Sequence, residues 1–254
     1  MIPLRDNIPT LRFPAITILL IVANVLAYFV WQRGGILHGP PDHNVIDYGW
    51  IPYEIKHPGQ QCIAQGQGIA CGDVPGQPPV LETAFTSMFM HGSILHLAGN
   101  MLFLWIFGNN VEDSMGKPKF IVFYLLGGLA ALAGQTLVAS GAGNAAPLVG
   151  ASGAIAAVLG GYIVLYPRAR VLTLFFIILF FTIIEIPAMV VLGIWFVEQL
   201  LFGAWGLSDP TGGGGGVAYF AHIGGFVFGL LLIRVFAHRK NPGYPPRPAS
   251  AMAA

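Results

Sequence analysis

The stretch GASGAIAAVLGGY, residues 150–162, decides how this chain can fold. Small residues recur at Ser152, Ala156 and Gly160, and the series repeats from Gly153 with the same spacing of four. This pattern allows two membrane helices to approach closely. The apolar run is about 16 residues long, or roughly 24 Å of helix, which is shorter than a hydrocarbon layer of about 30 Å. We therefore expect Ser152 to lie below the membrane surface, although taken alone it reads simply as a small packing residue.

The composition around this stretch is that of a membrane protein. Of 254 residues, 55% are hydrophobic and 9% are charged, whereas a soluble domain carries roughly 25% charged residues. The formal net charge of +1 gives no indication of nucleic-acid binding. The first apolar run begins near Phe13 and is too long for the apolar part of a cleavable signal peptide, about 7–15 residues. We expect it to be a membrane span.

The apolar segments predict an all-α polytopic membrane protein with a six-transmembrane-helix bundle. The expected spans are approximately 13–31, 94–111, 119–139, 151–166, 187–203 and 217–237. For one segment the sequence leaves two structures possible. Residues 171–186, VLTLFFIILFFTIIEI, are apolar enough to belong to the fifth span, whereas Pro187 favours a break or a kink there.

Positive charges predict the orientation of the spans, because cytoplasmic loops are enriched in lysine and arginine. Alternate connections and both terminal segments carry such residues: Arg5, Arg12, Lys117, Lys119, Arg168, Arg170, Arg239, Lys240 and Arg247. The opposite loops contain only Arg33 and Lys56. Both termini are therefore expected to be cytoplasmic in a multi-pass protein of the cell membrane.

The expected organisation is a single membrane domain with short ends. Residues 1–12 form a cytoplasmic N-terminal segment, 13–239 form the membrane domain with a large extracytoplasmic first loop of about 32–89, and 240–254 form a Pro-rich, disordered cytoplasmic tail. The glycine run 212–216, just before the sixth span, is expected to be the most flexible segment. It is either a loop that must move or an ordinary surface linker.

Two cysteines, Cys62 and Cys71, lie in the polar first loop. They suit a disulfide if that loop faces an oxidising compartment. Two free thiols are an equally good interpretation, whereas a metal site is disfavoured because no motif with metal-ligand spacing is present. We expect no cofactor and no metal.

Polar residues inside membrane spans are costly and are candidates for function. His96 and Asn100 lie four residues apart near the outer end of the second span, so they project from one helical face. Taken alone, they are better explained as side chains that hydrogen-bond a neighbouring helix. In AHIGGFVFGLLL, residues 221–232, His222 shares a face with Gly225 and Gly229. The face built for close helix contact therefore carries an imidazole.

If the sixth span packs on the fourth, His222 and Ser152 come within hydrogen-bonding distance. A serine hydroxyl is activated as a nucleophile by an adjacent general base, most often histidine. The developing oxyanion needs donors, which His96, Asn100 and the Ser152 backbone N–H at a helix N-terminus can supply, with Gly150 in the same supporting group. No acidic residue is expected at this depth, so we predict a serine–histidine dyad rather than a triad.

Three segments, in this order, resemble the rhomboid intramembrane serine proteases: HGSILHLAGNMLFLWIFGNNVEDSMG (91–116), GASGA (150–154) and AHIGGFVFG (221–229). The resemblance covers about 81–239. It implies that Ser152 and His222 are the catalytic dyad, that His96 and Asn100 contribute to the oxyanion site, and that Glu112 and Gly116 form a structural helix end.

The resemblance also implies substrates and dynamics. The substrates would be transmembrane proteins with small residues and helix-destabilising sequence near the outer membrane face, entering laterally near the second and fifth spans under a mobile fifth loop. Some members of the family carry a tyrosine four residues after the serine, where this chain has Ala156. Two alternatives are open for this chain. Either Phe103, Tyr219 or another aromatic residue stacks on the histidine instead, or no aromatic residue does.

Other functional classes fit the sequence less well. A transporter or channel would need paired ionisable groups or matching broken helices, and the fifth apolar region has only Glu185 and Glu198 without a basic partner. A zinc protease of the His-Glu-x-x-His type is excluded by the absence of that motif. Intramembrane aspartyl chemistry would need two buried aspartates, and no expected span offers one near its centre.

Overall fold

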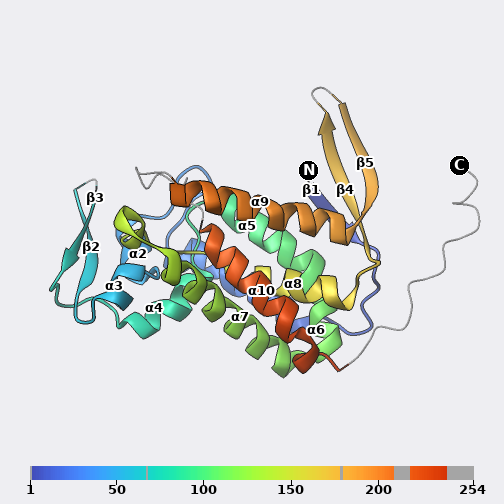
Figure 1. The fold of residues 1–254 in the computed structure, drawn as a ribbon, viewed down its shortest axis with the longest axis horizontal. Helices are drawn as coiled ribbons and strands as arrows, with labels where there is room; N and C mark the ends of the chain where they lie inside the picture. Colours follow the sequence, from blue (N-terminus) through green and yellow to red (C-terminus); the bar gives the residue numbers. More distant parts are fainter. Residues whose placement is uncertain (1, 67, 178–179, 209–217, 239–254) are drawn as a thin grey trace, which may run out of the picture.

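A computed structural model of the chain describes residues 2–66, 68–177, 180–208 and 218–238 (Figure 1). The glycine run 212–216 and the tail 240–254 lie outside the described residues, so the expectations for these two segments stay predictions. So does the part of the charge pattern that rests on Arg239, Lys240 and Arg247.

Apolar helices form the body of the protein (Figure 1). Their bounds are α1 (Ala15–Leu26) continued by the π-helical η1 (Ala27–Trp31); α5 (Ile94–Phe103), η3 (Leu104–Gly108) and α6 (Asn109–Met115), which follow one another without a break; α7 (Lys117–Val138); α8 (Ser152–Leu165); α9 (Ala188–Ser208); and α10 (Tyr219–Phe236). Each expected span corresponds to one of these helices. The prediction of a helical, polytopic membrane protein is confirmed.

Length and composition divide these helices into two groups. Among the described residues, four helices are long and apolar enough to cross a membrane, namely Ile94–Met115, Lys117–Val138, Ala188–Leu207 and Tyr219–Phe236. The apolar helices Ala15–Trp31 and Ser152–Leu165 are shorter. The short α8 agrees with the expectation of a recessed fourth helix.

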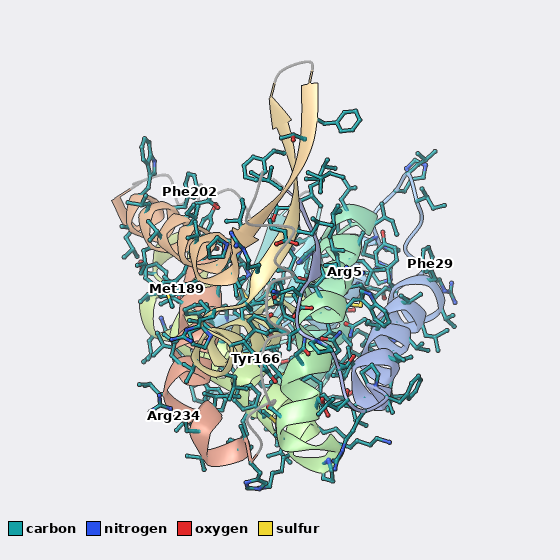
Figure 2. All side chains as sticks on the ribbon, turned by 90° about the vertical axis from the view of Figure 1, so that its right-hand side faces the viewer. Arg5, Phe29, Tyr166, Met189, Phe202 and Arg234 are labelled. Carbon is teal, nitrogen blue, oxygen red and sulfur yellow. A yellow bond between two sulfur atoms is a disulfide. The ribbon has the colours of Figure 1, made fainter. Side chains whose placement is uncertain are left out.

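The outer face of the bundle is apolar. Figure 2 shows Phe29 and Phe202 on opposite sides of the bundle, with Tyr166 between them. Phe29 and Phe202 are 42% and 53% exposed, whereas Tyr166 is buried. Trp205 on α9 and Leu231 on α10 are still more exposed. Large apolar side chains gathered on the outside of a helical bundle fit a lipid environment, because burial in lipid is the favourable state for them.

The expectation of an all-α fold is wrong for residues 171–186. This segment belongs to an antiparallel hairpin of β4 (Arg170–Ile177) and β5 (Phe180–Pro187), and β1 (Ile2–Asp6) pairs with β4. Figure 1 shows the hairpin projecting at an angle to the helices, at the end away from β2 and β3. Its phenylalanine, isoleucine and threonine residues favour strands, and Pro187 ends β5 just before α9 begins.

The first loop is folded and attached to the bundle. It contains α2 (Asp42–Tyr48), α3 (Pro52–Lys56), the hairpin of β2 (Gln61–Gln65) and β3 (Gly68–Gly72), α4 (Val80–Thr86) and η2 (Ser87–Phe89). A disulfide joins Cys62 to Cys71 across the hairpin. The structure therefore has the bridged form of the two alternatives left open by the sequence.

The segment before α8 is held by this first loop. Trp50 and Leu148 exchange two backbone hydrogen bonds, of 3.0 and 2.8 Å. The indole Nε1 of Trp50 donates to Oγ1 of Thr136 at 2.9 Å, near the end of α7. The backbone N–H of Gly150 donates to the carbonyl of Ser87 at 2.9 Å. The position of the α8 N-terminus thus depends on contacts far away in the sequence.

Glu112 anchors α1 to α6. Its two carboxylate oxygens accept hydrogen bonds from the backbone N–H of Ile16, at 3.0 Å, and of Thr17, at 2.8 Å, and from the Thr17 hydroxyl at 2.8 Å. These are N–H groups of the first turn of α1, which have no partner within the helix. Gly116, with φ of +82°, ends α6. The structure places both residues at the end of the second apolar helix.

Helices α8 and α10 are in backbone contact. Residues Gly153–Tyr162 of α8 are all buried. A methyl group added at Gly225 would collide with the carbonyl oxygen of Gly153, and one added at Gly229 would collide with that of Ala157. A methyl group added at Gly153 would collide with the side chain of Ala131 on α7. The three glycines expected to mediate packing therefore all lie in helix contacts.

We expect Gly229→Ala to lower stability, because the added methyl group must push α10 away from α8. Overpacking of this kind costs roughly 1–3 kcal/mol, and a fall in Tm of about 5 °C or more in detergent thermal unfolding is the expected result. Gly193→Ala on α9 is the matched control, since no atom lies within 4 Å of the added group. It should be neutral or stabilising by up to about 1 kcal/mol. Equal Tm values for both variants would contradict the contact.

Asp6 is a buried carboxyl group at the end of β1. Its Oδ2 accepts hydrogen bonds from the Tyr162 hydroxyl and from Nδ2 of Asn110, both at 2.6 Å. Burial raises the pKa of Asp6 from 3.8 to about 6, and the Tyr162 hydrogen bond partly offsets this. A carboxyl group whose pKa is raised by folding stabilises the protein below the unfolded pKa and loses that contribution as the pH rises through the folded pKa.

We expect Asp6→Asn to gain stability relative to the parent protein as the pH rises from about 4 to 7. The amide oxygen can accept the same two hydrogen bonds but carries no charge to bury. The raised pKa corresponds to a difference on the order of 3 kcal/mol, measurable as Tm of both proteins at each pH. A difference in Tm that is constant between pH 4 and 7 would show that Asp6 is not the titrating group.

Candidate active site

Ser152 and His222 meet at the contact between α8 and α10. Ser152 is the first residue of α8, and His222 lies in the first turn of α10. The Ser152 hydroxyl is 2.8 Å from Nε2 of His222. Both residues are half-buried. The structure therefore brings together the two residues that the sequence selects as nucleophile and base.

Gly150 shapes the entry into α8. Its φ of +130° lies in the region that favours glycine. A Cβ at this position would lie 2.8 Å from Nε2 of His96 and 3.5 Å from Oγ of Ser152. The imidazole of His96 and the Ser152 hydroxyl therefore lie on the same side of Gly150. Because Ser152 begins the helix, the N–H groups of the first turn of α8 have no acceptor within α8.

Asn100 is held by a second histidine. Its Nδ2 donates to Nε2 of His91 at 2.9 Å, and both side chains are buried. Burial and the neighbouring His96 lower the pKa of His91 to about 3, so its ring is neutral near pH 7 and can accept this bond. The rings of His91 and His96 meet edge to face at 5.0 Å. The structure thus pairs Asn100 with His91 and places His96 beside His91.

Gln32 fixes the backbone of His91. The His91 N–H donates to Oε1 of Gln32 at 2.9 Å, and Nε2 of Gln32 donates to the His91 carbonyl at 3.2 Å. A glutamine at the end of η1 thereby holds the start of the segment that carries His96 and Asn100. The sequence gives no signal for this pairing, because the two residues are far apart along the chain.

The other side of the His222 ring faces α9. The Nδ1 of His222 is 2.8 Å from Oε1 of Gln199. The Trp195 ring lies 5.6 Å from the imidazole with an angle of 38° between the planes. Of the alternatives that the sequence leaves open, the structure has another aromatic residue, Trp195, beside the histidine, and not Phe103 or Tyr219. Tyr219 packs on Phe202, and Phe103 packs on Phe107.

Sequence reasoning missed Gln199 and Trp195, although a weak signal was present. The two residues are four apart on an otherwise apolar helix, so they share one face. A glutamine in such a helix is costly unless it has a partner. The partner could not be identified without knowing which face of α9 is turned toward α10.

A small cavity adjoins Ser152. Its volume is about 30 Å³, which is enough for one or two water molecules or a small side chain. The walls are formed by small and apolar residues from η2, α7, the start of α8 and the start of α10, including Ser87, Ala131, Leu132, Gly150, Ala218 and Ala221. Ser152 therefore borders a small space within the bundle.

The described part of the chain contains no group of three or more His, Cys, Asp or Glu side chains placed to hold a metal ion. The Cys62–Cys71 disulfide lies in the β2–β3 hairpin of the first loop and not at the serine–histidine pair. It belongs to the framework that holds the residues before α8.

A hydroxyl hydrogen-bonded to an imidazole is the arrangement of a nucleophile with its general base. The fold and this site define a helical membrane protein with a serine–histidine pair embedded in its bundle. Residues 80–239 match the family model of the Rhomboid domain. The chain belongs to the rhomboid family.

Curated relatives agree with this assignment. The chain is 30% identical over 180 residues to Presenilin-associated rhomboid-like protein A, mitochondrial, of Danio rerio, covering 65% of this chain and 44% of the relative. It is 32% identical over 154 residues to Rhomboid protein 1, mitochondrial, of Saccharomyces cerevisiae, covering 57% of this chain and 39% of the relative. The chain thus spans less than half the length of these relatives.

Proposed function

We propose that this protein is an intramembrane serine endopeptidase that hydrolyses peptide bonds in or near the transmembrane segments of other membrane proteins. Membership of the rhomboid family supports this class of activity. The observation that carries the proposal is the 2.8 Å hydrogen bond between Ser152 and His222 inside an apolar bundle. Ser152 acts as the nucleophile and His222 as the general base.

The proposed reaction follows from these two groups. Oγ of Ser152 attacks the scissile carbonyl carbon while its proton moves to Nε2 of His222. The tetrahedral intermediate collapses when the same proton passes to the leaving amine, which breaks the C–N bond and leaves an acyl-serine. A water molecule, deprotonated by His222, then hydrolyses the ester and restores the serine.

The oxyanion of the intermediate needs donors that are already in place. We assign this role to the backbone N–H of Ser152, to His96 and to Asn100. The closeness of His96 to Gly150 supports its place in the group. His91 and Gly150 act indirectly, since His91 holds the amide of Asn100 and Gly150 leaves room for the His96 ring.

We further propose a six-span topology with both termini on the cytoplasmic side of a cell membrane. In this topology the dyad faces the extracytoplasmic side, together with the first loop. The alternation of basic residues supports this orientation. The Cys62–Cys71 disulfide also supports it, because disulfides persist in oxidising compartments. The short α8 keeps Ser152 below the outer surface, in a cavity that water must reach.

The substrates we propose are single-span membrane proteins with small residues at the cleavage site. The cavity of about 30 Å³ beside Ser152 favours a small side chain there. The peptide must be extended to reach the hydroxyl, so helix-destabilising sequence near the outer face should promote cleavage. Family resemblance points to lateral entry near α5 and α9.

The test is cleavage of a model transmembrane substrate by purified protein in detergent or liposomes. We expect Ser152→Ala and His222→Ala each to lower kcat/KM by more than about 10³-fold, because either change removes the activated nucleophile. A fluorophosphonate should label the parent protein and not Ser152→Ala.

The control is Ser114→Ala, a buried serine on α6 whose hydroxyl donates to the Val111 carbonyl. Thermal unfolding of every variant separates loss of chemistry from loss of fold. If folded Ser152→Ala and the parent cleave at equal rates, the protein is not a serine protease of this kind. A transport or scaffolding role would then take its place.

A further inference from the structure

Gln199 is a buried polar residue in the apolar helix α9, with an exposed fraction of 6%. Its amide makes two hydrogen bonds in different directions. Nε2 donates to the Trp195 carbonyl at 3.1 Å, and Oε1 lies 2.8 Å from Nδ1 of His222. A glutamine at membrane depth is expensive unless both ends of its amide are satisfied. Here the two ends have partners.

The two partners fix which way the amide points. A backbone carbonyl can only accept, so the NH₂ group of Gln199 must face Trp195 and the oxygen must face His222. The oxygen in turn can only accept, so the hydrogen of the neutral imidazole must be on Nδ1. Nε2 is then left with its lone pair directed at the Ser152 hydroxyl, 2.8 Å away. This is the tautomer that a general base for Ser152 needs.

We propose that Gln199 is a positioning residue for the reaction, whose amide oxygen holds His222 in the Nδ1–H tautomer and in the orientation that accepts the Ser152 proton. The inference rests on the proposed function and adds Gln199 to the Ser152–His222 dyad as the third member of a chain of hydrogen bonds. Gln199 does not touch the substrate. It acts through the imidazole, as the buried aspartate does in a Ser-His-Asp triad.

Neighbouring residues support this role for an amide rather than a carboxylate. Glu198 is adjacent in sequence, but it is exposed and lies on another face of α9. A buried carboxylate would have to be desolvated, which costs several kcal/mol in an apolar interior. An amide oxygen accepts the same hydrogen bond without that cost. Trp195, one turn earlier, packs on the imidazole ring. Helix α9 therefore contacts the edge of the ring through Gln199 and its face through Trp195.

The direct test is the tautomer of His222, measured by NMR of the imidazole nitrogens in protein labelled with ¹⁵N-histidine. The signals are assigned by their loss in His222→Ala. In the neutral ring of the parent protein we expect hydrogen on Nδ1 and none on Nε2. Hydrogen on Nε2 in the parent protein would overturn the proposal without any further variant.

Two variants test the consequence for catalysis. Gln199→Met keeps the size of the side chain but removes the acceptor. We expect kcat to fall about 10- to 100-fold with KM nearly unchanged, because a buried donor loses its partner and the wrong tautomer becomes populated. Gln199→Glu keeps an acceptor at this position, so it should retain more of kcat than Gln199→Met, with a lower Tm because a carboxyl group is buried.

Gln135→Met is the matched control. Oε1 of Gln135 accepts from the backbone N–H groups of Phe220 and Ala221 at the start of α10, at 3.1 and 3.3 Å. Its loss should lower Tm but leave the His222 tautomer as in the parent. A folded Gln199→Met with the kcat and the tautomer of the parent protein would overturn the inference while the protease proposal stands. A parent protein that neither cleaves nor reacts with a fluorophosphonate would overturn the protease proposal, and the tautomer would still test the contact.

Discussion

The close approach of α8 and α10 is the constraint on which the rest of the structure depends. Lipid offers no hydrophobic driving force between helices, so their association rests on packing and on interhelical hydrogen bonds. Gly225 and Gly229 lie directly against backbone carbonyls of α8, and Gly160 lies against the Phe226 carbonyl of α10. Only helices in such contact can hold a hydroxyl and an imidazole at 2.8 Å near their ends.

Further elements complete the site around this pair. The first loop pairs with Leu148 and holds Gly150, and so it sets the position at which α8 begins. Helix α9 supplies Trp195 and Gln199 to the outer side of His222. Both ring nitrogens of His222 have hydrogen-bond partners in this arrangement, Ser152 on α8 and Gln199 on α9, which offsets the cost of placing polar groups at membrane depth. Ser152 is thus set among side chains that are held by contacts with one another.

Much of this could be predicted from the sequence, for identifiable reasons. Small residues at a spacing of four on 150–162 and 221–232 indicate which faces touch, so the meeting of Ser152 with His222 follows from helical periodicity. Hydropathy alone cannot distinguish a membrane span from a hairpin of apolar strands, so it does not determine the structure of 171–186. The partners of His222 on α9 depend on the rotation of that helix. An isolated glutamine does not encode this rotation.

The central claim is that the hydroxyl of Ser152 and the imidazole of His222 are in contact in the membrane-embedded protein. A reagent that first acylates a reactive serine and then alkylates a histidine beside it measures this directly, with digestion and mass spectrometry of the product. We expect a crosslinked pair of peptides containing Ser152 and His222. No crosslink is expected between Ser152 and a histidine outside the site, such as His57 in the first loop. Acylation of Ser152 with a crosslink to another histidine, or with no crosslink, would contradict the account.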